Sequence, residues 1–248
     1  MARKFTRHVL TNRPDFFNLR NKRIVPGFTP QVVGLAGNDR IRGSDLLSGD
    51  ALNGNLGNDV IFGGKGLDTI TGGKGADYLK GEFGNDKIFG NNDNDKIFGG
   101  LGHDSCSGGI GDDTLNGGWG NDVLDGGPGN DALNGQANND VIRGFAGVDV
   151  LIGGPGKDLL DGGNGNDKLW GGAGRDSFRL SSGLDVIKDY SPVFDGSLRI
   201  STSVFARHSG YTLRDSPNGL QIRIGTFGIT TLEGVTTNNF NESKIIIG

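Results

Sequence analysis

The chain has 248 residues, of which 33% are hydrophobic and 48 are glycine, and its formal net charge is −4. This composition excludes an ordinary globular core, and it would indicate disorder if the glycines followed no period. A single cysteine excludes a disulfide framework, and no apolar run is long enough for a transmembrane helix.

Residues 1–33 precede the repeats and are predicted to form a basic N-terminal arm. Residues 1–30 hold seven Lys or Arg against Asp15 alone, which gives a local charge of +6. Such an arm either contacts an anionic ligand or is a solvated tail or cap. No nucleic acid partner is expected, and the arm lacks the apolar core of a signal peptide.

Residues 34–190 contain a repeat of nine residues, which has to be interpreted before any single element because it sets the architecture. An aspartate stands at every ninth position from Asp50 to Asp185, and an apolar residue follows two positions after each one. These apolar residues are Leu52, Ile61, Ile70, Leu79, Ile88, Ile97, Cys106, Leu115, Leu124, Leu133, Ile142, Leu151, Leu160, Leu169, Phe178 and Ile187.

The glycine positions of the repeat predict its local structure. Position one is glycine in every unit from Gly54 to Gly171, which indicates a backbone too closely packed for a Cβ. Position four is replaced only by Asp93 and Asn138, the residue types that best tolerate positive φ. We therefore expect a tight turn over the first six residues of each unit and a short strand over the last three.

Two units are expected to form one coil, so that successive coils extend two parallel sheets and the aspartates line up in files along both edges. Stacked carboxylates repel one another unless a cation lies between them. Carboxylate and carbonyl oxygens suit calcium best, because it prefers hard and flexible oxygen sites. The alternative is that the aspartates only initiate turns through their own backbone.

The units GGKGADYLK (residues 72–80), GGWGNDVLD (117–125) and GGNGNDKLW (162–170) resemble the nonapeptide of the repeats-in-toxin (RTX), or haemolysin-type calcium-binding, proteins. The resemblance implies an all-β, right-handed parallel β-roll, a two-sheet solenoid that holds multiple calcium ions between successive turns. It also implies export by type I secretion, with an uncleaved C-terminal signal.

Carried onto this chain, the resemblance implies two sets of calcium ligands. The carboxylates are those of Asp39, Asp50, Asp59, Asp68, Asp77, Asp86, Asp95, Asp104, Asp113, Asp122, Asp131, Asp140, Asp149, Asp158, Asp167, Asp176 and Asp185. The backbone carbonyls are those of Gly63, Gly72, Gly81, Gly99, Gly108, Gly117, Gly126, Gly153, Gly162 and Gly171. Weaker binding is expected at the turns that carry Asp93, Gln136, Asn138 and Phe145.

Residues 191–248 are predicted to form an antiparallel β cap and to carry a candidate secretion signal. Alternating residues on both sides of Ser216-Pro217-Asn218-Gly219 predict a hairpin. The stretch from Gly183 to Asp195 and the later Leu232 to Val235 resemble the closing region that follows such repeats in secreted proteins. The tail Ile245 to Ile247 is either a last strand or part of the export signal.

We expect no catalytic residues, because there is no H-E-x-x-H motif and the three histidines lack a partner constellation in the sequence. The predicted function is a secreted calcium-binding module with a structural or interaction role. The alternative is a carbohydrate-binding accessory module of a polysaccharide-acting enzyme. Its candidate partner surface, for an anionic polysaccharide or a cell surface, is Phe62, Tyr78, Lys80, Lys96 and Phe98, unless residues 1–33 cover these rings.

Overall fold

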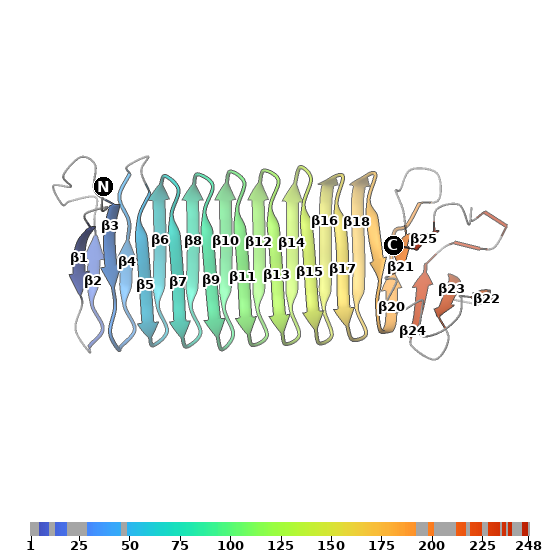
Figure 1. Cartoon of the computed structure of the whole chain (residues 1–248), viewed down its shortest axis with the longest axis horizontal. Coiled ribbons are helices and arrows are strands. Elements are labelled where there is room, and N and C mark those ends of the chain that lie inside the picture. The colour runs from blue at the N-terminus through green and yellow to red at the C-terminus, as the bar shows by residue number, and fades with distance from the viewer. Residues whose placement is uncertain are drawn as a thin grey trace. The chain divides into compact units, whose positions relative to one another are not determined.

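A computed structural model describes residues 5–9, 13–18, 29–45, 49–191, 198–200, 212–216, 219–224, 228–233, 235–236, 238–239 and 245–247. These residues form strands, bridges, turns and bends but no helix, and so none that could cross a membrane. The chain divides into two compact units, Met1–Asp125 and Gly126–Gly248, which we describe separately. Both consist of short strands stacked side by side (Figure 1).

The first unit contains two parallel sheets whose strands alternate along the chain. One sheet has the order β1 (Phe5–Val9), β3 (Thr29–Val33), β5 (Ala51–Leu56), β7 (Thr69–Lys74), β9 (Lys87–Asn92), β11 (Ser105–Ile110) and β13 (Val123–Pro128), the last of which continues over the border between the units. The other has the order β2 (Phe16–Asn18), β4 (Arg40–Arg42), β6 (Val60–Lys65), β8 (Tyr78–Phe83), β10 (Lys96–Leu101) and β12 (Thr114–Trp119).

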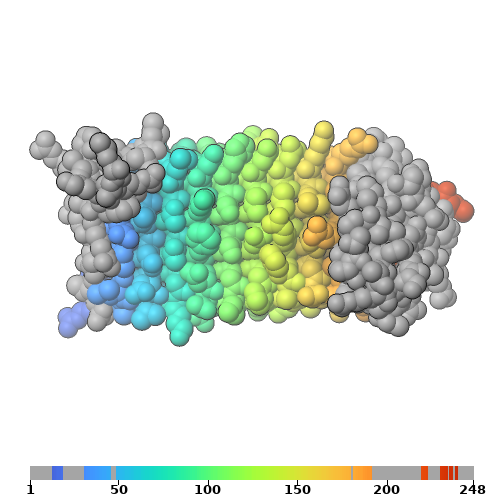
Figure 2. Space-filling view, viewed as in Figure 1, coloured from blue at the N-terminus to red at the C-terminus, as the bar shows by residue number. Residues whose placement is uncertain are grey.

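The register confirms that two repeats make one coil. Ile61 pairs with Leu79, and Leu79 with Ile97, each 18 residues further along the chain. The apolar residues that follow the aspartates by two positions are all buried, with at most 2% of each exposed. In the space-filling view, neighbouring coils of the first unit contact one another along their length (Figure 2). The core is therefore a narrow strip with one apolar side chain per repeat.

The strands are longer than the sequence predicts. β8 covers six residues, and only Gly84, Asn85 and Asp86 separate it from β9. The prediction of a six-residue turn was wrong because the residues at positions two and three still pair between coils, as Gly100 does with Gly118 and Leu101 with Trp119. Positive φ at position two bends the strand without ending this pairing.

The N-terminal residues that the structure describes join the two sheets as further strands. β1 pairs with β3, β3 pairs with β5, and β2 pairs with β4. Residues 19–28, which include part of the predicted cover over the aromatic surface, lie outside the described residues.

The second unit repeats the two-sheet arrangement and ends in antiparallel strands. One sheet has the order β15 (Val141–Ala146), β17 (Leu159–Asn164), β19 (Ser177–Leu180), β21 (Leu198–Ile200) and β25 (Ile245–Ile247). The other has the order β14 (Ala132–Ala137), β16 (Val150–Gly156), β18 (Lys168–Gly174), β20 (Gly183–Ile187), β24 (Gly228–Leu232), β23 (Gly219–Ile224) and β22 (Thr212–Ser216). The predicted hairpin is confirmed by β22 and β23, and the isoleucine tail is a strand parallel to β21.

Candidate metal centre

Each repeat aspartate ends a turn, and its side chain lies in a buried file. From Asp39 to Asp185 these side chains are at most 4% exposed. One carboxylate oxygen, Oδ1, accepts a hydrogen bond from the backbone N–H of the aspartate one coil earlier, for example 2.8 Å from Asp68 N to Asp86 Oδ1. This bond bridges two coils, whereas a turn initiator would bond within its own turn.

The other carboxylate oxygen, Oδ2, is buried and lacks a hydrogen-bond partner along most of both files. Within the described part of the chain this holds for Asp39, Asp59, Asp68, Asp77, Asp86, Asp95, Asp104, Asp149, Asp158, Asp167 and Asp176. A buried carboxylate oxygen without a partner is costly, and its regular recurrence needs a physical explanation. A bound cation at each oxygen would provide one.

Each of these oxygens borders a small space beside a position-one glycine. A Cβ added to Gly81 would lie 2.6 Å from the carbonyl oxygen of Gly99 in the next coil and closer still to Asp86 Oδ2. Gly90 has the same surroundings, namely the carbonyl of Gly108 and the carboxylate of Asp95. A carboxylate and a carbonyl from different coils thus border one space that admits no side chain, which fits the donor set that calcium prefers.

Most of the predicted carbonyl ligands border such a space. They are the carbonyls of Gly63, Gly72, Gly81, Gly99, Gly108, Gly117, Gly162 and Gly171. The carbonyl of Gly54 does the same beside Gly34 and Asp39, and the sequence did not predict it. The eleven-residue step from Asp39 to Asp50 hid this pairing, because there the repeat loses its period.

Burial raises the pKa of the aspartates above their ordinary value. The pKa rises to about 8 at Asp68 and Asp95 and to about 7 at Asp77 and Asp104. Removal from water is the largest cause; the backbone hydrogen bond on Oδ1 lowers the pKa, and carboxylates one coil away raise it again. Without a cation, the charged form is therefore disfavoured near neutral pH.

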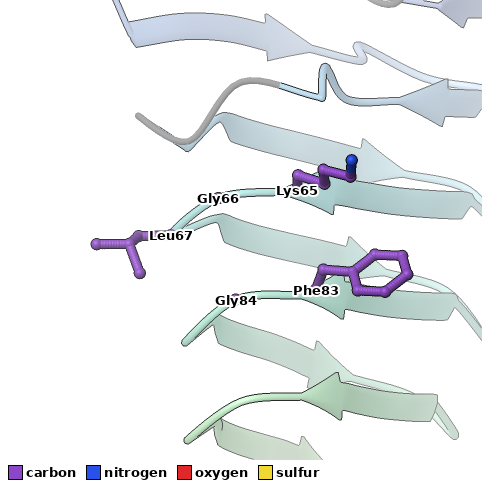
Figure 3. Close-up of a pocket in the computed structure, with 5 residues that line it drawn as sticks. All are labelled: Lys65, Gly66, Leu67, Phe83 and Gly84. Atoms are coloured by element: carbon purple, nitrogen blue, oxygen red, sulfur yellow. The ribbon is translucent and has the colours of Figure 1, made fainter.

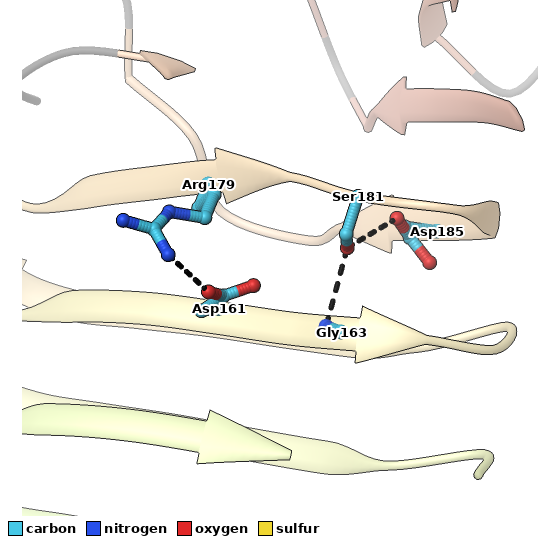
Figure 4. A network of polar contacts seen from close by, with 5 residues as sticks. All are labelled: Asp161, Gly163, Arg179, Ser181 and Asp185. Carbon is cyan, nitrogen blue, oxygen red and sulfur yellow. Dashed lines mark hydrogen bonds and ion pairs between the residues drawn. The ribbon is translucent and has the colours of Figure 1, made fainter. Parts of the chain in front are cut away.

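The first and last aspartates of the nine-residue run differ from the interior ones. Asp50 Oδ2 accepts hydrogen bonds from the backbone N–H of Ser44 at 2.5 Å and from its hydroxyl at 2.9 Å. Asp185 Oδ2 accepts a longer bond of 3.5 Å from the Ser181 hydroxyl, which itself accepts the Gly163 N–H (Figure 4). At both places a serine supplies a partner for Oδ2, which Oδ2 of Asp68 and Asp86 lacks.

Side chains alone do not form a metal site in the described residues, since no three His, Cys, Asp or Glu side chains converge there. Any ion here would depend on backbone carbonyls.

Cys106 lies in the apolar strip, and burial raises the pKa of its thiol well above the usual value. His103 takes the place of asparagine in an exposed turn, and its Nδ1 accepts the Asn121 N–H at 2.8 Å.

The five residues of the candidate partner surface lie together on β6, β8 and β10. The ring centroids of Phe62 and Tyr78 are 6.0 Å apart, and those of Tyr78 and Phe98 are 5.2 Å apart. Lys80 pairs in register with Phe62 and with Phe98. The guanidinium of Arg42 lies 5.3 Å from the Phe62 ring centroid, a neighbour that the irregular first coil concealed in the sequence.

Comparison with known proteins gives a family and similar solved structures. The family described as RTX calcium-binding nonapeptide repeat (4 copies) matches residues 31–45, 46–79, 71–106, 107–133, 125–160 and 152–187, together more than half of the chain. The solution structure of the AlgE6R3 subunit from the Azotobacter vinelandii mannuronan C5-epimerase is similar at 28% identity and a TM-score of 0.35, covering 51% of this chain and 80% of that one. No curated protein matches the chain.

Proposed function

The chain belongs to the RTX calcium-binding nonapeptide repeat family, and from this premise we propose that it is a non-catalytic extracellular module that folds when its repeats bind several calcium ions. The observation that carries the proposal is the row of buried Oδ2 atoms without partners, most of which border the same space as a carbonyl of the next coil. Bound calcium would supply the positive charge that these stacked carboxylates require.

The interior aspartates are the proposed ligands, together with the position-one carbonyls. Their Oδ1 atoms accept a backbone N–H of the previous coil, so the Oδ2 atoms stay aimed at the space between coils. Because this space exists only when two coils are stacked, binding energy is also folding energy. Asp50 and Asp185 are proposed to contribute less, since a serine already contacts the oxygen concerned.

Equilibrium dialysis against labelled calcium tests this proposal on the full chain. We expect several ions per chain, and magnesium in excess should displace few of them because it demands near-octahedral geometry. A stoichiometry of zero or one ion per chain would contradict the proposal. The Asp86→Asn variant should bind fewer ions than the wild type, whereas Asp50→Asn should bind nearly as many.

An extracellular role follows from the affinity expected of such sites. Calcium modules outside cells work at dissociation constants on the order of 10⁻⁴ to 10⁻³ M, so the chain would stay unfolded before export and fold after it. Type I secretion fits this order of events. When the chain is expressed with a type I exporter, deletion of residues 191–248 should keep it inside the cell; release that does not depend on these residues would count against the route.

A carbohydrate-binding role is the second candidate, and the adjacent rings of Phe62, Tyr78 and Phe98 beside Lys80 favour it. Aromatic faces stack on sugar rings, while the ammonium groups of Lys80 and Lys96 would pair with acidic groups of the polymer. Calorimetry with a polyuronate should show binding that the double variant Phe62→Ala, Phe98→Ala abolishes. Phe89→Ala, an exposed ring on the other sheet, is the control and should bind normally.

A further inference from the structure

A line of large exposed side chains follows one turn edge of the first unit. Lys65, Phe83, Leu101 and Trp119 end strands β6, β8, β10 and β12 and are neighbours in register. Phe83 is 48% exposed, Leu101 46% and Trp119 66%. We call these four residues the edge strip.

The β-roll itself does not require large apolar residues at this place in the repeat. In the second unit the same place of the repeat holds Ala137, Pro155 and Ala173, at or next to the last residue of the equivalent strands. Exposing Phe83, Leu101 and Trp119 to water in adjacent coils therefore has no structural explanation within the repeat. A contiguous exposed apolar strip of this kind indicates a binding surface.

The geometry points to a second copy of this chain as the occupant, and we propose an antiparallel dimer through the edge strip. The order of the strip is self-complementary: with a two-fold axis between Phe83 and Leu101, each Phe83 meets the other copy's Leu101. Each Lys65 then meets the other copy's Trp119. Every residue of the strip gains a fitting neighbour, because Lys on Trp is a cation–π pair and Phe on Leu is an apolar one.

The surface beside the strip has hollows at the places that this pairing needs. One hollow of about 240 Å³ lies between Lys65, Leu67 and Phe83, with Lys65 and Phe83 on neighbouring coils and Leu67 projecting from the turn (Figure 3). It would receive the indole of the other copy's Trp119. A second hollow, of about 280 Å³, is lined by Lys80, Glu82, Phe83, Gly100 and Leu101 and lies at the proposed axis.

The length of the edge strip limits the area that the dimer can bury, and so its strength. Its four strands span about 15 Å at the usual strand spacing, so the buried area is below that of a stable obligate dimer and the association is weak. Because the strip exists only in stacked coils, calcium-dependent folding would make the dimer calcium-dependent. Circular dichroism reports folding and sedimentation reports association, so failure of the dimer and failure of calcium-dependent folding give different results.

Sedimentation equilibrium of the calcium-loaded full chain, over about 5 to 500 µM, tests the proposal. We expect a concentration-dependent shift from monomer to dimer. Trp119→Ala and Phe83→Ser should each weaken association about tenfold with unchanged circular dichroism. The matched control is Ile110→Ser on the opposite turn edge, where 61% of the side chain is exposed; it should dimerise like the wild type.

The register has its own test. Lys65→Glu should weaken association about fivefold through loss of the cation–π pair, whereas Lys74→Glu on the opposite edge should not. A mixture of Phe83→Cys and Leu101→Cys chains should form the mixed disulfide faster than either chain links to itself.

A monomer at all concentrations would overturn the proposal, as would equal effects of Ile110→Ser and Trp119→Ala. If Trp119→Ala instead abolishes vesicle or polymer binding by a monomer, the strip has another occupant and the dimer is wrong.

Discussion

The two oxygens of one aspartate have different partners in this fold. In Asp86, Oδ1 accepts the Asp68 N–H at 2.8 Å, while Oδ2 is buried without a hydrogen bond. Asparagine could reproduce the first contact but not the charge at the second. This difference separates the structural contribution of each aspartate from its proposed contribution to calcium binding.

We expect Asp86→Asn to raise the calcium concentration at the folding midpoint, because it keeps an acceptor for Asp68 N–H and removes the charged oxygen. Asp86→Ala should raise it further, since it also leaves that N–H without a partner, at a cost of about 1–3 kcal/mol. Asp50→Asn is the control, because Ser44 already contacts its Oδ2. Calcium titrations followed by circular dichroism would refute the ligand assignment if Asp86→Asn and the wild type share one midpoint.

The raised pKa values make folding dependent on pH in a definite direction. Folding raises the pKa of Asp68 and Asp95 from 3.8 to about 8, so between these values the metal-free folded form binds more protons than the unfolded chain. Its stability therefore falls as pH rises through this window and recovers as the carboxyls are protonated.

Two opposite pH responses follow from this linkage. In chelator, acidification from about pH 8 to pH 5 should increase the β signal in circular dichroism. In calcium, the same acidification should raise the midpoint concentration, because protons compete for the Oδ2 atoms. A calcium midpoint that is constant over this range would contradict ligation by these carboxylates.

Phe145 adopts a backbone conformation that elsewhere in the repeat is mostly left to glycine. Its φ is 76°, in the left-handed region that costs an L-residue about 1–2 kcal/mol. Phe145→Gly should raise the free energy of unfolding in calcium by up to about 1 kcal/mol, because the greater freedom of glycine in the unfolded chain offsets part of the gain. Gly118→Ala, at φ 112°, should instead lower it. Urea unfolding measures both changes, and a less stable Phe145→Gly would contradict this account.

At the scale of elements, each strand gains its partners from the coils on both sides, so the ends of the stack need special contacts. β18 pairs with β20 only through Lys168 and Leu169. Beyond that point, Asp189 accepts the N–H groups of Gly171 and Gly172, both at 2.8 Å. One carboxylate thus supplies acceptors for β18 where its pairing with β20 stops.

Asp189→Ala should destabilise the second unit by about 1–3 kcal/mol, because the half-buried Gly171 N–H loses its acceptor, while the exposed Gly172 N–H can turn to water. Asp189→Asn keeps one acceptor oxygen and should cost less. Hydrogen exchange of the Gly171 and Gly172 amides measures the effect directly. Unchanged protection of these two amides in Asp189→Ala would show that the contact does not hold the end of β18.

The period of nine was enough to predict the coil, the register of 18 and the buried strip, because each depends only on which residues recur. The length of the strands was not predictable, because Gly-Gly indicates a turn and yet pairs between coils here. The contacts of Ser44 and Arg42 were hidden by the irregular step before Asp50. The edge strip became visible only when the register placed Phe83 beside Leu101.

At the scale of the whole molecule, the chain has little apolar surface to bury and many carboxylates to bring together. One apolar side chain per repeat forms the core of each unit, while the aspartates of each unit lie in buried files. Such a composition does not favour folding without a compensating charge. The central claim is therefore that calcium supplies the missing stability.

Far-UV circular dichroism of the full chain in excess chelator and then in millimolar calcium tests this claim most directly, with millimolar magnesium as the control. We expect a largely unfolded spectrum in chelator, a strong β spectrum in calcium, and little change in magnesium. The same β spectrum in chelator at neutral pH as in calcium would contradict the claim.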